Sequence, residues 1–441
     1  MHSALRSSLG LALLLPALAA CDWLYGASKP APLPGERISI MQIESSLKPA
    51  AELAGEPITL PEPRSNADWQ QAFGSAAHLS GHVQFADAPK RVWSASIGHG
   101  SDSSTKLLGQ PIVADGVVFA MDSEGEVSAH RLDNGGSLWS RDITPDDEDD
   151  GPLGAGLAFA DGKLFATTGF AEVVSLDAKT GKELWRRKVS GPARSSPVVA
   201  NGRVFVVCID NTAYALDAGD GRVLWNHTGT SEGAGLLGAA TPAVDGDVVV
   251  IAYSSGELYG LRANNGRQLW ADFLSLPRRI SAVSDLNDIR ASPVIAGGRV
   301  YAVGNAGRMV SIVLNNGARA WDQRISGVQT PLLAGEVIYV LNTDNELIAL
   351  SARDGRVRWV KQLPRYEDEE RKRRPIDWVG PILAGDRLVL AGSHEYAISV
   401  SPYTGEIIGQ SDLPDPVRIA PIAAQGTVIF LTDNGNLVAY R

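Results

Sequence analysis

Residues 176–185 read LDAKTGKELW, and close copies of this decapeptide recur along the chain. Copies that end at Trp225, Trp270 and Trp359 read LDAGDGRVLW, LRANNGRQLW and LSARDGRVRW. Each copy places an apolar residue first, then a polar turn that contains glycine, and then tryptophan. Glycine supplies the positive φ that tight turns need, and tryptophan supplies a large flat surface for packing. The decapeptide therefore predicts a structural unit that is repeated many times.

Two sets of equivalent positions recur along the sequence with the same spacing, and we call them columns. The first is the tryptophan of the decapeptide. The second, the proline column, consists of segments such as SPVVANG and TPLLAG, each followed by a β-rich run. Both columns have eight members, if Gly409 is counted in a tryptophan place and Leu157 in a proline place. The seven tryptophans, which we expect to dock between neighbouring units, are Trp93, Trp139, Trp185, Trp225, Trp270, Trp321 and Trp359.

Each unit contains four short runs of alternating or β-branched residues, separated by Asn-Gly, Asp-Gly or Thr-Gly pairs that favour tight turns. Helical periodicity is nearly absent. Four strands repeated every 38 to 51 residues predict an all-β fold, an eight-bladed β-propeller with four-stranded blades. The body begins with an unpartnered strand around Trp93 and ends at NLVAYR without a tryptophan strand. We expect the ring to be closed by pairing of this N-terminal strand into the last blade.

The N-terminus has the features of a targeting segment. Arg6 precedes a 12-residue apolar run, Leu9 to Ala20, which is too short to span a bilayer. The sequence LAAC at residues 18–21 resembles a bacterial lipobox, in which the chain is cut before the cysteine and the cysteine is acylated. An ordinary signal peptide cut near the same place is the alternative. The expected segments are a signal peptide over residues 1–20, lipidated Cys21 with a Pro-rich tether over 21–75, and the propeller over 76–441.

The net charge argues against a nucleic-acid binder, and the cysteine content argues against a disulfide bond. The chain has a net charge of −10, whereas a sequence-independent nucleic-acid binder would show a basic surface. Its two cysteines are Cys21 and Cys208, so a lipid on Cys21 leaves no disulfide. Within the tether, Trp69 and Phe73 are expected to dock back onto the body.

The decapeptide, with its Leu-Asp, Thr-Gly and Trp, resembles the tryptophan-docking repeat of the PQQ-like propeller superfamily over residues 90–441. Taken with the lipobox and the tether, the chain is similar to the BamB family of lipoproteins. This resemblance implies a non-catalytic scaffold that is lipid-anchored in the outer membrane and faces the periplasm. It also implies binding to BamA, the barrel-inserting subunit of the β-barrel assembly machinery, and help in delivering unfolded outer-membrane proteins. Asp22 leaves retention at the inner membrane as the alternative, because an aspartate after the lipidated cysteine has that effect in enteric bacteria.

The alternative from another class is a periplasmic PQQ-dependent dehydrogenase, or a relative without cofactor that binds a small ligand at the central pore. Quinoprotein alcohol dehydrogenases carry an adjacent-cysteine disulfide and a Ca²⁺ ion held by carboxylate and amide oxygens. This chain has no Cys-Cys pair, and its seven histidines show no metal-ligand spacing. We therefore expect no catalytic residue, no metal site and no cofactor.

The connectors that follow the tryptophans vary most in length, and equivalent connectors of a propeller emerge on one face. Long loops on a rigid scaffold are where recognition usually occurs. Two neighbouring connectors, residues 226–241 and 271–292, correspond by resemblance to BamB loops that contact BamA.

In the BamB family the first loop carries Leu-x-Leu-Arg and the second carries Asp-x-Asp. Alignment on the following prolines places Leu236 on the second leucine, Leu237 on the arginine, and Asp288 and Arg290 on the two aspartates. A shifted register uses Asp285 and Asp288 instead. These five residues are the expected partner-binding residues. The structural alternatives are that Leu236 packs under its own loop and that Asp288 caps a turn.

Overall fold

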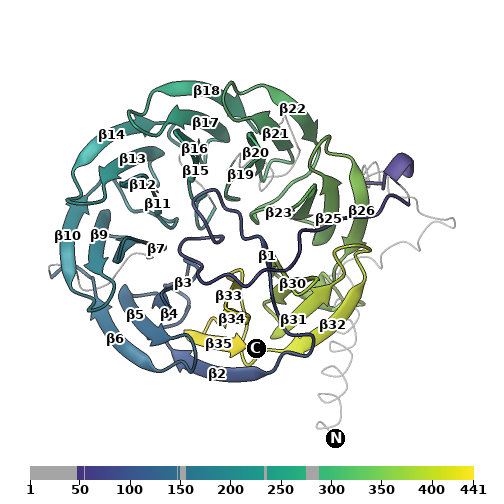
Figure 1. Ribbon diagram of the computed structural model, residues 1–441, viewed down its shortest axis with the longest axis horizontal. Helices are drawn as coiled ribbons and strands as arrows, with labels where there is room; N and C mark the ends of the chain where they lie inside the picture. Colours follow the sequence, from purple (N-terminus) through teal and green to yellow (C-terminus); the bar gives the residue numbers. More distant parts are fainter. Residues whose placement is uncertain (1–46, 54, 147, 149–154, 233–235, 275–287) are drawn as a thin grey trace, which may run out of the picture. The chain divides into compact units, whose positions relative to one another are not determined.

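The computed structural model describes residues 47–441 apart from residues 54, 147, 149–154, 233–235 and 275–287, and these residues form one compact unit. Eight small antiparallel sheets surround a central axis, as Figure 1 shows. The predicted eight-bladed β-propeller is thus confirmed. Cys21 and Asp22 lie outside the described residues, and so does Asp285. No helix in the described part of the chain is long and apolar enough to cross a membrane.

Each blade contains four strands, and in blades 1 to 7 these follow chain order from the axis outward. Blade 1 consists of β3 (Ile112–Ala114), β4 (Val117–Met121), β5 (Glu126–Arg131) and β6 (Ser137–Asp142). Blade 2 consists of β7 (Gly156–Ala160), β8 (Lys163–Thr167), β9 (Glu172–Asp177) and β10 (Glu183–Lys188). Blade 3 consists of β11 (Val198–Ala200), β12 (Arg203–Val207), β13 (Thr212–Asp217) and β14 (Val223–Thr228), and blade 4 of β15 (Ala243–Asp245), β16 (Val248–Ala252), β17 (Glu257–Arg262) and β18 (Gln268–Phe273).

Blade 5 consists of β19 (Val294–Ala296), β20 (Arg299–Val303), β21 (Met309–Val313) and β22 (Arg319–Gln323). Blade 6 consists of β23 (Leu332–Ala334), β24 (Val337–Leu341), β25 (Glu346–Ser351) and β26 (Val357–Gln362). Blade 7 consists of β29 (Trp378–Ala384), β30 (Arg387–Gly392), β31 (Tyr396–Val400) and β32 (Ile407–Asp412). Blade 8 consists of β33 (Ile422–Ala424), β34 (Thr427–Leu431), β35 (Asn436–Tyr440) and β2 (Arg91–Ser96). The remaining elements are the 3-10 helix η1 (Ala51–Leu53), the hairpin β27 (Tyr366–Asp368) and β28 (Arg373–Pro375), and the two-residue strand β1 (His82–Val83).

The second strand of each blade is buried on both faces because a neighbouring blade packs against each side. The sequence of β16, VVVIA, is buried at all five positions. Such a continuous apolar run is typical of strands covered on both faces. The outermost strands face solvent instead, and β10 therefore carries the charged sequence ELWRRK with no fully buried residue.

The ring closes where the two ends of the propeller meet. Strand β2 pairs antiparallel with β35, with Trp93 opposite Ala439, and Figure 1 shows blue β2 beside yellow β35. Lys90 and Arg441 exchange two backbone hydrogen bonds of 2.9 and 3.0 Å just beyond this pair. The predicted pairing of the N-terminal strand into the last blade is confirmed.

Each tryptophan of the repeat reaches from the outermost strand of one blade to the turn between the third and fourth strands of the next blade. The Trp225 indole Nε1, for example, donates a hydrogen bond of 3.0 Å to the Ala263 carbonyl. Its ring covers Gly266, where an added Cβ would come within 2.7 Å of the indole. The other six indoles donate in the same way, Trp93 to Leu132, Trp139 to Ala178, Trp185 to Ala218, Trp270 to Leu314, Trp321 to Ala352 and Trp359 to Pro402.

The turn glycine of the repeat is therefore required for two reasons. Gly266 has a φ of +71°, which side chains rarely adopt, and it also leaves room for the tryptophan of the preceding blade. From the sequence only the first reason was evident.

Gly409 replaces tryptophan for a reason that follows from ring closure. It lies in β32, the outermost strand of blade 7, so its docking place would be the turn between the third and fourth strands of blade 8. Blade 8 has no such turn, because its third strand β35 and its fourth strand β2 come from opposite ends of the propeller. At this junction the Tyr440 hydroxyl donates a hydrogen bond of 2.9 Å to the Asp412 carbonyl.

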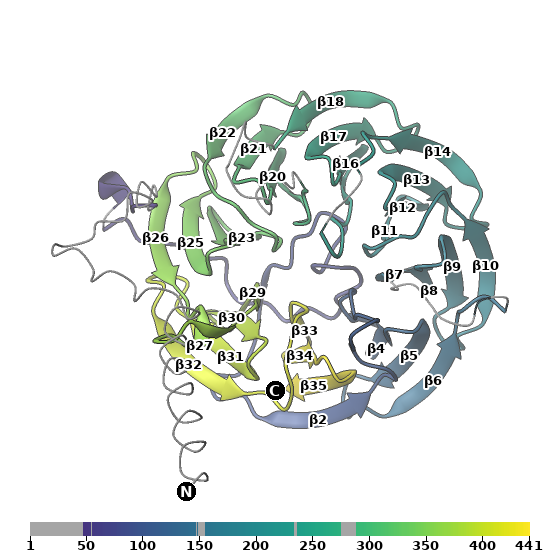
Figure 2. The same cartoon turned by 180° about the vertical axis from the view of Figure 1, so that it is seen from behind.

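Residues 64–84, which we call the central segment, pass through the middle of the ring (Figures 1 and 2). The segment returns on itself, since Arg64 bridges to Val83. Its residues meet the innermost strands in order around the ring, Asn66 at β33, Trp69 at β3, Gln70 at β7, Gln71 at β11, Ala76 at β15, Ala77 at β19 and His82 at β29. The remaining blade is contacted just before the segment, where an added Cβ on Gly335 would come within 3.2 Å of the Thr59 carbonyl. The segment and the residues just before it thus link all eight blades.

Residues 47–75, expected from the sequence to belong to the tether, lie in the same compact unit as the blades. Trp69 is 1% exposed and packs with the cluster formed by blades 7, 8 and 1. Phe73 is half-buried and meets the His78 ring edge-on, with the ring centroids 5.2 Å apart. The expected docking of these two aromatic residues is observed.

His78 makes the stability of the central segment dependent on pH. It is 3% exposed, its Nδ1 lies 2.7 Å from the Pro293 carbonyl oxygen, and burial lowers its pKa from 6.5 to about 4. Because the unfolded chain takes up this proton first, the folded state loses stability as pH falls from 6.5 to about 4. We expect His78 to account for about 3 kcal/mol of lost unfolding free energy over this range.

The measurement is urea unfolding at pH 7 and pH 4 for the wild type and for His78→Gln. The variant should lose clearly less stability between the two pH values than the wild type. Equal losses in both proteins would show that other groups produce the acid sensitivity.

Candidate functional site

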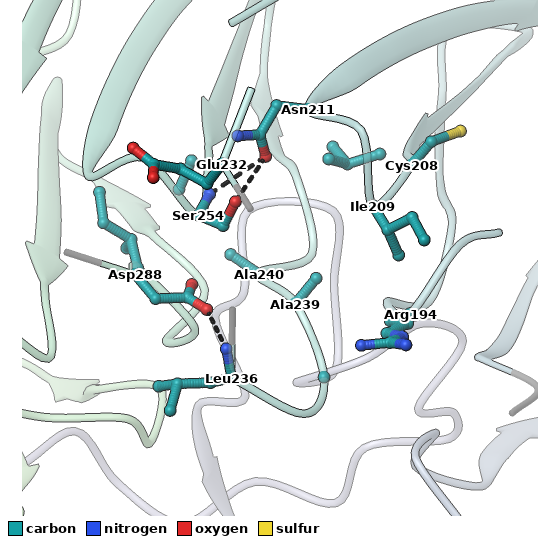
Figure 3. Close-up of a pocket in the computed structure, with 14 residues that line it drawn as sticks. Arg194, Cys208, Ile209, Asn211, Glu232, Leu236, Ala239, Ala240, Ser254 and Asp288 are labelled. Carbon is teal, nitrogen blue, oxygen red and sulfur yellow. Dashed lines mark hydrogen bonds between the residues drawn. The ribbon is translucent and has the colours of Figure 1, made fainter. Parts of the chain in front are cut away.

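The connectors 226–241 and 271–292 lie in contact in their described parts. The Leu236 backbone N–H donates a hydrogen bond of 2.7 Å to the Asp288 carboxylate, which Figure 3 shows. The Thr241 N–H donates to the Ser292 hydroxyl at 3.0 Å. Two loops that follow different blades are therefore joined at their bases.

Beside this contact lies a cavity of about 240 Å³, which we call the connector cleft. Its apolar lining comes from residues at the ends of β12 and β16 and from the two connectors, and includes Val207, Ile209, Ala252 and Ile289. Its polar lining consists of Arg194, Asn211, Glu232, Ser254 and Asp288. In Figure 3, Arg194 and Asp288 lie on opposite sides, with Ala239 and Ala240 between them. An apolar cleft with a few polar groups of both charges is suited to receive side chains of a partner.

The predicted partner-binding residues occupy different depths. Asp288 is 3% exposed, and burial raises its pKa although the Leu236 N–H and Arg290 favour the charged form. Leu236 is half-buried, whereas Leu237 is 41% exposed. Asp288 thus holds the first connector in place from below, and Leu237 is available at the surface.

Arg290 lies half-buried beneath the first connector. An added Cβ on Gly238 would come within 3.0 Å of its Nε atom. Burial lowers the pKa of Arg290, an effect that Asp288 and Asp377 partly offset. Arg290 lines a cavity in the middle of the ring and does not line the connector cleft.

The connector 226–241 is rooted in blade 4 through Glu257. This carboxylate accepts hydrogen bonds from the Thr230 N–H at 2.7 Å, the Thr230 hydroxyl at 3.0 Å and the Ser255 hydroxyl at 2.7 Å. Burial raises the pKa of Glu257, but the hydrogen bonds from Ser255 and Thr230 outweigh burial and lower it. A carboxylate held charged in this way fixes the start of the loop.

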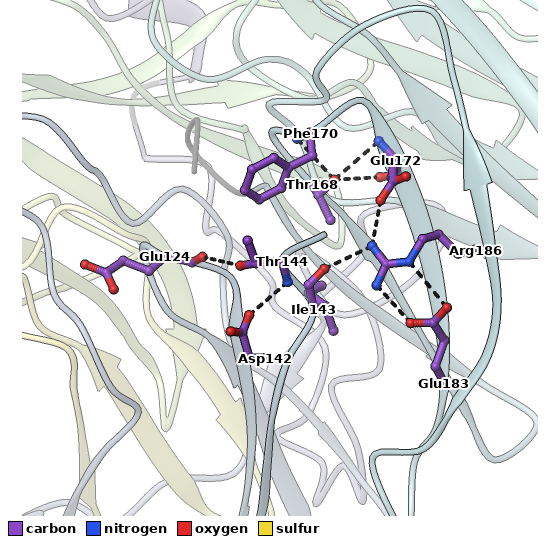
Figure 4. A network of polar contacts seen from close by, with 9 residues as sticks. All are labelled: Glu124, Asp142, Ile143, Thr144, Thr168, Phe170, Glu172, Glu183 and Arg186. Carbon is purple, nitrogen blue, oxygen red and sulfur yellow. Dashed lines mark hydrogen bonds and ion pairs between the residues drawn. The ribbon is translucent and has the colours of Figure 1, made fainter. Parts of the chain in front are cut away.

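An equivalent network fixes the start of the connector after blade 1 (Figure 4). Arg186 of blade 2 donates to the Ile143 carbonyl at 3.0 Å and to the Glu172 carboxylate at 2.6 Å. It also pairs with Glu183 at 2.8 Å. The connectors after blades 1 and 3 therefore both start from positions fixed by hydrogen bonds to a neighbouring blade.

A second cavity, of about 100 Å³, lies in the middle of the ring, and we call it the central chamber. Its lining includes Phe73 of the central segment and Arg194, Arg290 and Arg418 from three connectors. Arg194 lines both cavities.

The described residues do not form a carboxylate-rich metal site like the Ca²⁺ site of a PQQ-dependent dehydrogenase. Within the described part of the chain, no group of three His, Cys, Asp or Glu side chains could hold a metal ion. The Ca²⁺ ion of such an enzyme needs oxygen ligands of this kind. The middle of the ring is instead crossed by the central segment.

The fold and the repeat define a β-propeller of the tryptophan-docking, PQQ-like class. A family model described as "Outer membrane protein assembly factor BamB" matches residues 123–361, which is more than half of the chain. The chain therefore belongs to the BamB family.

Individual relatives agree with this assignment. The chain is 23% identical over 359 residues to the outer membrane protein assembly factor BamB of Moranella endobia, a match that covers 80% of this chain and 90% of the relative. The crystal structure of BamB from Moraxella catarrhalis has a TM-score of 0.67 at 17% identity, and the match covers 80% of this chain and 100% of that chain. A quinohemoprotein alcohol dehydrogenase from Comamonas testosteroni has a TM-score of 0.63 at 12% identity, covering 85% and 80%. These two structures show likeness of fold.

Four polar residues that line the connector cleft were missed from the sequence, namely Arg194, Asn211, Glu232 and Ser254. A usable signal existed for Arg194. It precedes Pro197 by three residues, as Arg290 precedes Pro293, so the phase of the proline column places both at the same level of their blades. Asn211, Glu232 and Ser254 give no such signal, because their positions at the cleft depend on the course of the loops that carry them.

Proposed function

We propose that this protein is a non-catalytic scaffold lipoprotein of the β-barrel assembly machinery. In this proposal it is anchored in the outer membrane through Cys21, faces the periplasm, and binds a BamA-like barrel-assembly protein through the connector face. The binding helps that partner to assemble and insert outer-membrane β-barrel proteins. The observation that carries the proposal is membership of the BamB family, whose relatives are named outer membrane protein assembly factors.

The geometry supports the connector face as the binding surface. Leu237 presents an apolar side chain to solvent beside a cleft of about 240 Å³. Asp288 and Glu257 hold the first connector from below, so the surface is organised before a partner arrives. Preorganised loops lose less conformational entropy on binding. Asp288 acts here as a positioning residue, and Leu237 as a contact residue.

Replacing Leu237 with aspartate will reduce recovery of the barrel-assembly partner at least tenfold. A charge placed at an apolar contact must be desolvated without a partner, which opposes association. The measurement is gentle detergent extraction of native membranes that contain the tagged full-length protein, followed by quantification of the co-purified barrel protein.

The matched control is Val223→Asp, because Val223 is an aliphatic residue of similar exposure, 43%, on outer strand β14. Recovery in the control should equal the wild type. Equal recovery in all three proteins would place the partner contact away from Leu237. No barrel protein with the wild type would overturn the proposed function.

A further inference from the structure

The central chamber is lined in part by the central segment and collects positive charge. Ala72 and Phe73 of the central segment line it, together with residues from connectors all around the ring. Arg194, Arg290 and Arg418 line it as well, and no acidic residue does so in the part of the chain that the structure describes. The whole chain has a net charge of −10, so this local excess of cations runs against the overall charge.

The repeat itself directs these arginines toward the axis. Each stands three residues before the proline-column residue of its blade, namely Pro197, Pro293 and Pro421. Equivalent positions of successive blades lie at the same height around a propeller axis. The three side chains consequently line one chamber although they are far apart in sequence.

The three arginines differ in how they are neutralised. Arg418 is paired with Asp433 and lies 3.7 Å from Asp377. Arg290 has Asp288 and Asp377 as the nearby opposite charges, without an ion pair to either. The Arg194 side chain has neither an ion pair nor a hydrogen bond within the described residues. Two of the three guanidinium groups therefore have unused hydrogen-bonding capacity.

Ser195 provides an independent observation at the same place. It lines the chamber, is 4% exposed, and its buried hydroxyl has no hydrogen-bond partner among the described residues. Buried hydroxyl groups are normally hydrogen-bonded, so an exception indicates a missing partner. A hydroxyl beside unpaired guanidinium groups is suited to donate to a negatively charged oxygen.

We propose that the central chamber binds one oxyanion group, a carboxylate or a phosphate, through Arg194, Arg290 and Ser195. Planar guanidinium groups match the geometry of both oxyanions, and the chamber is of a size for one such group. Arg418, which is already paired, adds to the positive potential. The site does not require the proposed partner, because it lies in the middle of the ring. Of its three residues only Arg194 also lines the connector cleft.

The test is isothermal titration of the full-length protein, extracted in detergent, with inorganic phosphate and separately with acetate. Chloride keeps the ionic strength constant at pH 7. We expect saturable binding of at least one of the two anions with one site per chain. Phosphate binding alone identifies a phosphate site, acetate binding alone identifies a carboxylate site, and binding of both identifies a general oxyanion site. Binding of neither anion overturns the proposal.

Three variants separate the chamber from general charge effects. Arg194→Gln should weaken the anion affinity at least tenfold, and Ser195→Ala should weaken it several-fold while the guanidinium groups remain. Arg222→Gln is the control, because Arg222 is 63% exposed and pairs with Asp217 and Asp220 of its own turn. Unchanged affinity in Arg194→Gln and Ser195→Ala, or an equal loss in the control, contradicts the chamber as the site.

Discussion

Replacing Trp270 with alanine will lower the free energy of unfolding by about 3–5 kcal/mol. Trp270 is 5% exposed, and its Nε1 donates a hydrogen bond of 2.6 Å to the Leu314 carbonyl in the next blade. The ring also covers Gly317 of that blade and Gly260 of its own blade. Truncation opens a cavity between two blades that the rigid sheets cannot fill, and it leaves a buried carbonyl without its donor.

The measurement is urea unfolding at pH 7, and the control is Leu138→Ala. Leu138 is 41% exposed on outer strand β6, so its loss should change the unfolding free energy by no more than about 0.5 kcal/mol. A small effect of Trp270→Ala would mean that neighbouring blades are held together by their inner strands alone.

Trp69→Ala will be comparably destabilising, by about 3–5 kcal/mol, although Trp69 belongs to no blade. Its side chain is 1% exposed, and its backbone N–H and carbonyl both bond to Val113 of β3 at 2.8 Å. Loss of the ring should also loosen the central segment. Hydrogen exchange should then accelerate at the Phe159 and Val244 amides, which donate to Gln70 and Ala76 of this segment.

Leu79→Ala is the control within the same segment, because Leu79 is 37% exposed. It should leave both the unfolding free energy and the exchange rates nearly unchanged. If Trp69→Ala lowered stability without changing exchange at Phe159 and Val244, the segment would not link the blades as a unit.

The architecture could be predicted from the sequence because the signals that encode it are periodic. Tryptophan, turn glycine and proline recur in one phase, and the count of units gives the count of blades. Even the exception at Gly409 marks the blade interface next to the closure. The central segment could not be predicted in this way, since it contacts the blades largely through backbone hydrogen bonds. Such bonds leave no side-chain pattern, apart from the apolar character of Trp69.

The contact between the two connectors agrees with their expected neighbouring positions, and their role in binding a partner stays a prediction. The two connectors could be identified from their length and their phase after Trp225 and Trp270. The sequence could not show that Asp288 lies beneath the loop while Leu237 lies at the surface. This arrangement depends on the hydrogen bond from the Leu236 N–H to the Asp288 carboxylate. The central chamber depends on residues from connectors of six blades, which only the closed ring brings together.

The pairing of β2 with β35 also constrains when the molecule can finish folding. The first strand of the propeller and the last three strands form one sheet, so β2 must wait for β33, β34 and β35, which are synthesised much later. Contacts between such distant parts of a chain form slowly, and until they form the incomplete ring has exposed sheet edges. A chain that lacks its last twenty or so residues would keep those edges permanently. Pairing of β2 with β35 thus also protects the folding chain against edge-to-edge association, since it covers the sheet edges that the incomplete ring leaves open.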